Sequence, residues 1–226
     1  MSNFIVATIH PWNIKAFNHY SKTLTGNWHL ITDKDDLTIE IINKINPDYI
    51  FFPHWSWLVP NDIYTQWNCV CFHMTDVPFG RGGSPLQNLI IRGLSKTKVS
   101  ALQMTEQLDA GPVYLKHPMA LNGSANDIFN QLANVVAEMI SEIVAKKPVP
   151  IEQSGDIVHF ERRTPEQSEI PNDISVEKLY DFIRMLDAPS YPKAFVQQGS
   201  NKLEFSDAKL ENGTLTAKVT FGTDLN

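Results

Sequence analysis

Short, uninterrupted apolar runs alternate with amphipathic segments in the N-terminal part of this sequence, and this alternation limits the fold more than any other feature. The first three runs are residues 4–9, 28–32 and 49–52. Apolar runs of this length are typical of strands buried on both faces, and the segments between them carry apolar residues at helical spacing. The order strand, helix, strand, helix, strand predicts an α/β protein with a mostly parallel sheet and crossover helices.

The remaining elements follow from the same patterns. Further strands are expected at 69–73, 98–104 and 113–121, with an irregular, glycine-rich loop at 75–83. Helices are expected where a capping residue precedes helical spacing, which occurs at Asp36, Ser84, Ser124 and Ser175. A polar linker at 162–171 precedes the last helix, and an alternating pattern at 194–221 predicts an antiparallel meander. The expected division is a catalytic domain at 1–172 and a small C-terminal helix and β-hairpin subdomain at 173–226.

Composition excludes several classes of protein. The net charge is -6, whereas proteins that bind nucleic-acid phosphates usually carry an excess of Lys and Arg. Cys69 and Cys71 lie two apart on an expected strand, about 7 Å from each other, which is too far for a disulfide. No basic region followed by an apolar stretch begins the chain, and no apolar run of about 18 residues occurs. The expectation is a reduced cytoplasmic protein without a secretion signal or membrane span.

Polar residues that could perform chemistry stand where the expected strands end. In open α/β sheets, ligands bind beyond the carboxyl ends of the strands. His73 ends the fourth strand, and Asp109 is placed at the end of the strand that begins near Lys98. A histidine and a carboxylate that meet there form a general acid and base pair. Each residue also has a plain structural interpretation, His73 as a hydrogen-bonded residue and Asp109 as a turn former.

Two loops have the composition of ligand-binding loops. The run Gly80–Gly83 before a helix indicates anion binding by backbone N–H groups, or else a flexible turn. It is not a dinucleotide-binding fingerprint, because Pro85 stands where a third glycine would fall. The loop that contains Trp55 and Trp57 could stack on a flat ligand or simply cover the edge of the sheet.

Three segments occur in an order that is informative as a set. They are Cys71-Phe72-His73 with Pro78, Arg81-Gly82 and Ser84-Pro85 after it; Leu108-Asp109-Ala110-Gly111 with Gln103-Met104 before it; and Trp57-Leu58-Val59-Pro60. Over roughly residues 45–200 the chain resembles the formyltransferases that use 10-formyltetrahydrofolate. That family includes methionyl-tRNA formyltransferase, the glycinamide ribonucleotide enzyme and the sugar N-formyltransferases. The resemblance implies a Rossmann-like formyltransferase fold and an enzyme with 10-formyltetrahydrofolate as co-substrate and no metal.

The resemblance also implies roles for individual residues. His73 is the acid and base, with Asp109 as its partner in proton transfer. Cys71 stands where the family has an Asn that faces the formyl oxygen, and a thiol is a weaker hydrogen-bond donor than an amide. The folate is expected on an apolar surface made by Trp57, Leu58, Val59, Pro60, Met104 and Leu108. The substrate is expected at Arg81, Gly82, Gly83, Arg162 and Arg163.

The acceptor is predicted from the finer resemblance. Segments 73–85, Phe160–Pro165 and Ala188–Pro192 are most similar to sugar N-formyltransferases of the pseudaminic acid type. The predicted substrate is therefore the amine of a nucleotide-linked amino sugar, such as a CMP-linked nonulosonate. The acidic charge and the short C-terminal part disfavour tRNA and other nucleic acid as partners. A carrier-bound aminoacyl group, an aminoacyl-tRNA and a catalytically inactive folate-binding protein stay as alternatives, and a homodimer is left open. A Rossmann-type oxidoreductase is disfavoured by the missing glycine fingerprint.

Overall fold

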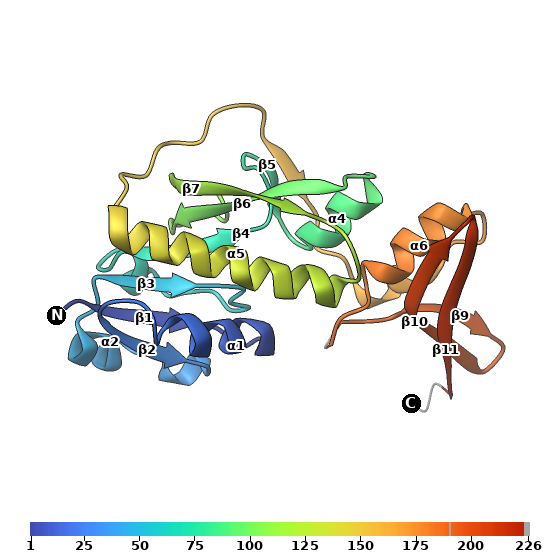
Figure 1. Ribbon diagram of the computed structural model, residues 1–226, viewed down its shortest axis with the longest axis horizontal. Helices are drawn as coiled ribbons and strands as arrows, with labels where there is room; N and C mark the ends of the chain where they lie inside the picture. Colours follow the sequence, from blue (N-terminus) through green and yellow to red (C-terminus); the bar gives the residue numbers. More distant parts are fainter. Residues whose placement is uncertain (190, 224–226) are drawn as a thin grey trace. The chain divides into compact units, whose positions relative to one another are not determined.

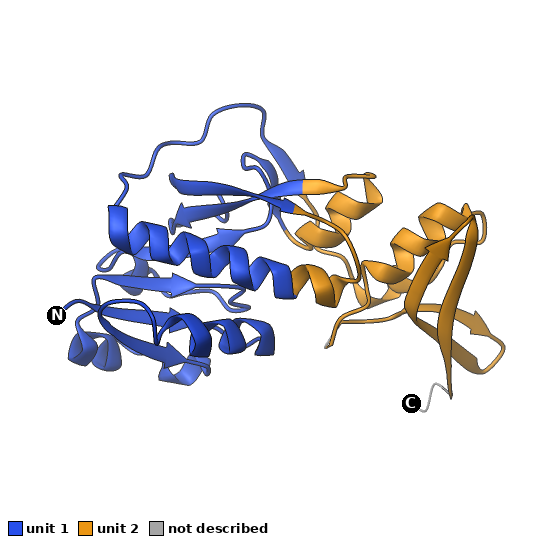
Figure 2. Ribbon diagram, in the orientation of Figure 1, with its two compact units in different colours: residues 1–82, 97–119, 130–159 blue, residues 83–96, 120–129, 160–226 orange. Residues whose placement is uncertain are grey.

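The computed structural model describes residues 1–189 and 191–223, so Ser190 of the Ala188–Pro192 motif lies outside the described residues. The chain forms two compact units (Figure 2). The first contains residues 1–82, 97–119 and 130–159, and the second contains 83–96, 120–129 and the residues from 160 onward. The domain division at residues 172 and 173 stays a prediction.

A six-stranded sheet with the order β2-β1-β3-β4-β6-β7 is the frame of the first unit (Figure 1). Its strands are β1 (Asn3–Ala7), β2 (Asn27–Ile31), β3 (Tyr49–Phe52), β4 (Cys69–His73), β6 (Lys96–Gln103) and β7 (Val113–Ala120). β1 pairs in parallel with β2 and β3, and β3 pairs in parallel with β4, whereas β4 and β6 are antiparallel. The predicted α/β class and mostly parallel sheet are confirmed.

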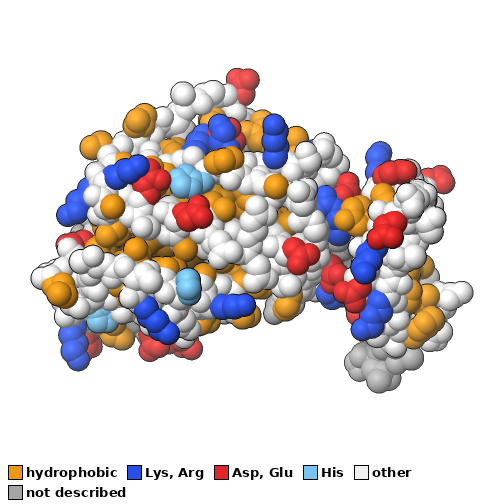
Figure 3. All heavy atoms as spheres, in the orientation of Figure 1, with side chains coloured by type: hydrophobic (Ala, Val, Ile, Leu, Met, Phe, Trp, Pro, Cys, Tyr) orange, Lys and Arg blue, Asp and Glu red, His pale blue; other side chains and the backbone are white. Residues whose placement is uncertain are grey.

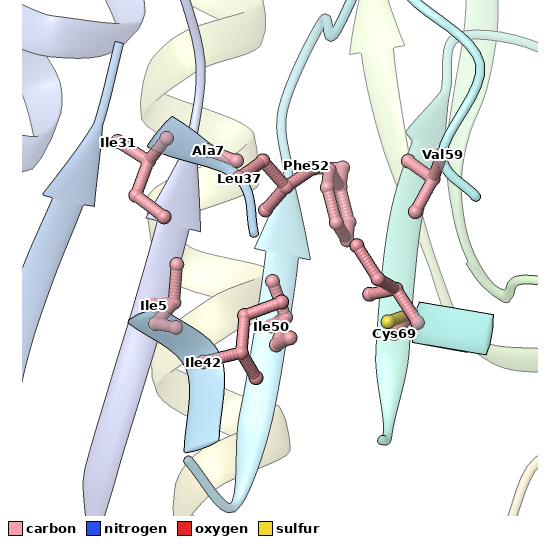
Figure 4. Close-up of a cluster of buried hydrophobic side chains, with 10 residues drawn as sticks. Ile5, Ala7, Ile31, Leu37, Ile42, Ile50, Phe52, Val59 and Cys69 are labelled. Atoms are coloured by element: carbon pink, nitrogen blue, oxygen red, sulfur yellow. The ribbon is translucent and has the colours of Figure 1, made fainter. Parts of the chain in front are cut away.

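Helices cover both faces of this sheet. They are α1 (Pro11–Tyr20), the 3-10 helix η1 (Lys34–Asp36), α2 (Ile39–Ile45), α3 (Asn61–Tyr64) and α5 (Ala125–Lys146), which continues into the second unit. On one face lies a core of ten buried residues, namely Ile5, Ala7, Ile31, Leu37, Ile42, Ile50, Phe52, Val59, Ile63 and Cys69 (Figure 4). α5 runs behind the opposite face in the same view.

α2 begins at a different capping residue from the one expected, and α5 is long and apolar. The cap predicted at Asp36 is wrong, because Thr38 precedes α2 and its Oγ accepts a hydrogen bond from the Ile41 N–H at 3.2 Å. Asp36 instead ends η1. Among residues 1–189 and 191–223, α5 is the one helix long and apolar enough for a membrane span. Of its apolar window, 44% is buried in the fold, as in the core helix of a globular protein.

The second unit contains α4 (Pro85–Ile91), the 3-10 helix η2 (Pro165–Ser168), α6 (Val176–Arg184) and an antiparallel sheet. The strands of this sheet are β9 (Ala194–Gln198), β10 (Asn201–Glu211) and β11 (Thr214–Thr223), in the order β11-β10-β9. The meander predicted at 194–221 is confirmed, and α6 packs against β10. Ser84 stands before α4 as predicted, but its Oγ accepts a hydrogen bond from the Arg163 N–H rather than from a helix N–H group.

A small two-stranded sheet was not expected. β5 (Phe79–Gly82) pairs with β8 (Val158–Phe160). The prediction that 75–83 is irregular throughout is therefore wrong for its second half. β5 follows β4 after a short connection, and this places its backbone beside the end of β4, where His73 lies.

Candidate active site

His73 and Asp109 meet beyond the carboxyl end of β4. His73 is the last residue of β4, whereas Asp109 lies in the loop between β6 and β7 and not at the end of a strand as expected. His73 Nδ1 is 3.5 Å from Asp109 Oδ1, and the two side chains are only 9% and 11% exposed. This distance is longer than that of a strong hydrogen bond, but catalytic pairs are often this long before substrate binds.

β5 holds both members of this pair. His73 Nε2 is 2.7 Å from the Gly80 carbonyl oxygen, and the Gly82 N–H donates to Asp109 Oδ2 at 2.9 Å. Because a carbonyl oxygen can only accept, His73 Nε2 carries a hydrogen. Nδ1 then faces Asp109 Oδ1 either with a second hydrogen or with a lone pair.

The backbone around Asp109 is constrained on several sides. Asp109 has a φ of 54°, in the left-handed region that few non-glycine residues adopt. A Cβ at Gly111 would lie 1.8 Å from the Gln103 carbonyl oxygen, so a side chain cannot be accommodated there. The Gln153 Nε2 donates to the carbonyl oxygens of Asp109 and Gly111 at 2.9 and 2.8 Å. The Asp-x-Gly spacing of the motif therefore reflects a tight turn that presents the carboxylate to His73.

The glycine-rich run uses its backbone N–H groups within the chain. The Gly82 N–H binds the Asp109 carboxylate, and the Gly83 N–H donates to the Phe160 carbonyl oxygen at 2.9 Å. Arg81 is only 6% exposed, and its Nε and Nη2 donate to Gln153 Oε1 at 3.1 and 2.8 Å. The anion that this run binds in the structure is the carboxylate of Asp109. A role for Arg81, Gly82 and Gly83 in binding substrate stays a prediction.

The residues predicted to hold the folate divide into an exposed and a buried set. Leu58, Leu108 and Trp57 are 92%, 65% and 40% exposed. Val59 belongs to the buried core, Met104 packs against that core, and the exposed Pro60 directly precedes α3. Large apolar side chains exposed in a loop mark a ligand-binding or interaction surface when they occur together. The aromatic and aliphatic groups at 57–60 and the neighbouring loop at 104–108 suit a flat, largely apolar ring.

Cys71 packs against the apolar core and lies near the Asp109 carboxylate. Its side chain packs against the core, as those of Trp55 and Met104 do. Burial, together with the nearby Asp109 carboxylate, raises the pKa of the Cys71 thiol to about 12. The thiol is therefore protonated at neutral pH. A protonated thiol is a weak hydrogen-bond donor, and it is a poor nucleophile because only the thiolate is effective. Cys69 and Cys71 are both free, as expected.

The other residues predicted to bind substrate lie in the second unit. A Cβ at Gly83 would lie 2.5 Å from Arg162 Cβ, so glycine lets these two segments approach closely. Arg162 is exposed. Arg163 donates through Nη2 to the Gln167 carbonyl oxygen, and its guanidinium lies 5.7 Å from the centre of the Phe182 ring. Burial lowers the pKa of Arg163.

Sequence reasoning missed an aromatic cluster at the ends of β1 and β3. The His10 and Trp12 rings stack with their centres 4.6 Å apart, and the His10 and His54 rings lie 4.0 Å apart. Burial and the neighbouring His10 lower the pKa of His54 to about 3, and burial also lowers the pKa of His10. The cluster is thus uncharged at neutral pH. The strand order reverses between β1 and β3, and this reversal is where open α/β sheets bind ligands.

The chain is similar in sequence and in structure to known formyltransferases. Residues 165–222 match the family model described as methionyl-tRNA formyltransferase, C-terminal domain. The methionyl-tRNA formyltransferase of Rickettsia felis is 30% identical over 209 residues, which is 89% of this chain and 67% of that protein. A solved structure of methionyl-tRNA formyltransferase from Clostridium thermocellum is 47% identical, covers 99% of this chain and 100% of that chain, and has a TM-score of 0.96.

The chain belongs to the formyltransferase family. A 4-N formyltransferase from Francisella tularensis has the same fold, with a TM-score of 0.66, 15% identity and 96% of each chain covered. At that identity the likeness shows the fold alone. Family membership makes the chain an enzyme that transfers a formyl group to an amine, with 10-formyltetrahydrofolate as the formyl donor.

The residues of the site fit this chemistry. 10-Formyltetrahydrofolate supplies a formyl group bound to nitrogen, and the exposed Trp57, Leu58 and Leu108 can cover its ring. The transfer requires that a proton leave the attacking amine and that a proton reach the departing nitrogen. An imidazole and a carboxylate that face each other at 3.5 Å are groups able to accept the first proton and donate the second. The hydrogen bonds to β5 fix the orientation of both side chains.

Proposed function

We propose that this formyltransferase acts on the amine of methionyl-tRNA. The observation that supports this acceptor best is the 47% identity to the Clostridium thermocellum methionyl-tRNA formyltransferase over 99% of this chain. The 30% identical Rickettsia felis relative has the same named activity, and this chain spans 67% of its length. The sugar acceptor predicted from the sequence receives weaker support, because a likely sugar N-formyltransferase of known structure from Mycobacterium tuberculosis is only 17% identical. Closeness to the pseudaminic acid type has no support beyond the sequence motifs.

In this proposal, each part of the site has one task. His73 and Asp109 move the proton, and the folate lies against the surface formed by Trp57, Leu58, Val59, Pro60, Met104 and Leu108. The acceptor enters beyond the ends of β1 and β3, beside the half-buried, uncharged rings of His10 and His54. Aromatic rings of this kind stack on nucleic-acid bases regardless of sequence, and an aminoacyl-tRNA ends in a base beside its amino acid. Arg162 and Arg163 are proposed as contacts for acceptor phosphates.

A nucleotide-linked amino sugar is the second candidate acceptor, and the net charge of -6 favours it. A protein that binds tRNA gains much of its affinity from cations that neutralise phosphates, and this chain has 19 Lys and Arg against 25 Asp and Glu. A nucleotide sugar carries few phosphates and needs few cations. A cytoplasmic location and a possible homodimer belong to the same proposal, and a cytoplasmic location agrees with the two free thiols.

The test supplies the protein with 10-formyltetrahydrofolate and three acceptors in parallel: methionyl-tRNA, a CMP-linked amino nonulosonate and free methionine. Mass spectrometry of each acceptor measures formylation. We expect formyl-methionyl-tRNA, no reaction of free methionine, and a rate that falls with rising salt because phosphate contacts weaken. The His73→Ala variant is the matched control for catalysis.

The other outcomes are distinct from one another. Formylation of the nucleotide sugar with untouched methionyl-tRNA would replace the proposed acceptor by the second candidate. A folate-dependent rise in melting temperature with no product from any acceptor would support the inactive folate-binding alternative, because binding to the native state stabilises it. No such rise at millimolar folate would contradict the assignment of the folate surface.

A further inference from the structure

Gln153 occupies a position in the first unit that the family motifs do not include. It lies in the segment between α5 and β8, which is anchored two residues earlier by paired backbone hydrogen bonds between Ile151 and Val113 at 2.8 and 2.9 Å. Its side-chain amide makes four hydrogen bonds. The oxygen accepts from Nε and Nη2 of Arg81, and the nitrogen donates to the carbonyl oxygens of Asp109 and Gly111. A primary amide has two donor hydrogens and two acceptor lone pairs, so every bonding site of this side chain is in use.

Three consecutive residues of β5 are connected to the catalytic pair through these contacts. The Gly80 carbonyl oxygen receives the hydrogen of His73 Nε2, and the Gly82 N–H binds Asp109 Oδ2. Arg81, between them, is buried and reaches the backbone of Asp109 only through Gln153. β5 therefore holds His73 directly, and it holds Asp109 both by its carboxylate and, through Gln153, by its backbone.

Asp109 requires this second connection more than His73 does. His73 is fixed by its place at the end of a sheet strand, whereas Asp109 lies in a loop with a left-handed φ of 54°. Backbone in such a region persists only where surrounding contacts over-determine it. Of the polar contacts described for Asp109, the bond from Gln153 is the one that fixes its backbone oxygen. Loss of that bond would free the turn and let the carboxylate move from His73.

We propose that Gln153 is a positioning residue for formyl transfer, and that its amide sets the distance between His73 Nδ1 and Asp109 Oδ1. The inference rests on the proposed role of this pair in proton transfer. It also gives Arg81 a task different from binding substrate, namely to orient the Gln153 amide by bonding its oxygen. Reaction rates are sensitive to such placement, because a displacement of about 1 Å can reduce turnover by about 100-fold.

The decisive variants change the donor and acceptor functions of residue 153 separately. Gln153→Met keeps the length of the side chain and removes all four hydrogen bonds. Gln153→Glu keeps an acceptor for Arg81 but replaces the donating nitrogen with an oxygen that faces two carbonyl oxygens. Glu152→Ala, at the exposed neighbouring position, is the matched control. Each variant is measured for kcat, KM for the folate and melting temperature, and for hydrogen exchange of the Gly82 amide, which reports the bond to Asp109.

We expect Gln153→Met to lower kcat by about 10- to 100-fold while KM for the folate stays within about twofold. Gln153→Glu should lower kcat at least as much although the partner of Arg81 is retained. Both variants should exchange the Gly82 amide faster, whereas Glu152→Ala should match the wild type. A Gln153→Glu variant with near wild-type kcat would overturn the proposal, since Gln153 would then serve only Arg81. A loss confined to KM, or one that parallels a loss of folded protein, would overturn it as well.

Two further measurements keep the inference decidable. If Gln153→Met does not fold, the double variant Arg81→Met/Gln153→Met removes the buried guanidinium together with its partner, and the same fall in kcat is expected. If the wild-type protein formylates neither methionyl-tRNA nor the nucleotide sugar, the proposed acceptor fails. The inference is then decided by the Gly82 exchange rates, which need no acceptor: unchanged exchange in both Gln153 variants would contradict it.

Discussion

The polar centre and the apolar loop of the site lie at the same edge of the sheet but are held in opposite ways. In the centre, His73 and Asp109 are almost fully buried, and each is bonded to a backbone group of β5. In the loop after β3, Leu58 is 92% exposed, and in the loop between β6 and β7, Leu108 is 65% exposed. The centre is thus organised by the fold itself, whereas the loop presents apolar surface that a ligand must cover.

This difference separates the proposed contribution of hydrogen bonds to catalysis from that of apolar burial to folate binding. Hydrogen bonds made within the protein orient the proposed proton-transfer pair before substrate arrives, so the proposal requires no reorganisation at the moment of reaction. The apolar side chains contribute only when the folate covers them, through the area removed from water. Changes in the centre should therefore act on kcat, and changes in the loop should act on folate affinity.

Figure 3 shows one face of the molecule, where hydrophobic side chains are interspersed with charged ones.

The largest effect is expected from removal of either member of the proton-transfer pair. His73→Ala and Asp109→Ala should each lower kcat by at least about 100-fold, the usual size of an acid and base contribution. His73 ends β4 and Asp109 lies in the loop between β6 and β7, so the melting temperature should change little, and folate should still bind. Steady-state kinetics with the proposed acceptor gives the measurement. Near-full activity of His73→Ala would show that the centre is wrongly assigned.

Changes to the exposed apolar residues Leu58 and Leu108 should give an intermediate effect, on folate affinity rather than on kcat. Leu58→Ser and Leu108→Ser each remove an exposed apolar side chain, and full burial of a leucine is worth about 1.5–3 kcal/mol. Each change should weaken folate binding by about tenfold, and kcat at saturating folate should stay near that of the wild type. Isothermal titration with a reduced folate measures the affinity.

Val149→Ser is the matched control for the loop variants, because Val149 is 83% exposed and belongs to neither part of the predicted site. It should leave folate affinity unchanged. An equal loss of affinity in Val149→Ser, or a fall of kcat without loss of affinity in the loop variants, would remove the distinction between the two regions.

The sequence predicts the strands that are encoded locally, but not the pairing of strands that are distant in the chain. β3 and β4 have the predicted bounds, because each is an apolar run ended by a polar or turn-forming segment. β5 and β8 were missed because their pairing joins residues about 80 apart in the chain, and β5 contains two glycines. Local periodicity carries no signal for such a pair.

The candidate site shows a similar limit. His73 and Asp109 were identified from strand ends and motif order, and the structure brings them together. Gln153 lies 44 residues from Asp109 and 72 from Arg81 in a stretch with no periodicity, so its role appears only in the folded chain. The cluster of His10, Trp12 and His54 was missed for a similar reason, because its members come from the start of α1 and the loop after β3, which become neighbours only in the folded chain.

The smallest effect is expected at Cys71, which lies between the two regions. Its thiol packs in the apolar core and has a pKa of about 12, so it is neither a strong hydrogen-bond donor nor a nucleophile at neutral pH. Cys71→Ala should therefore lower kcat by less than about tenfold, below the loss that follows removal of a true oxyanion donor. Cys69→Ala is the matched control, because burial raises the pKa of that thiol to about 12 as well and its side chain belongs to the same core. In the native protein at pH 8, neither thiol should react with iodoacetamide, as mass spectrometry can measure. A loss in Cys71→Ala comparable to that in His73→Ala, or a formyl adduct on Cys71 without acceptor, would show instead that the thiol takes part in the polar centre.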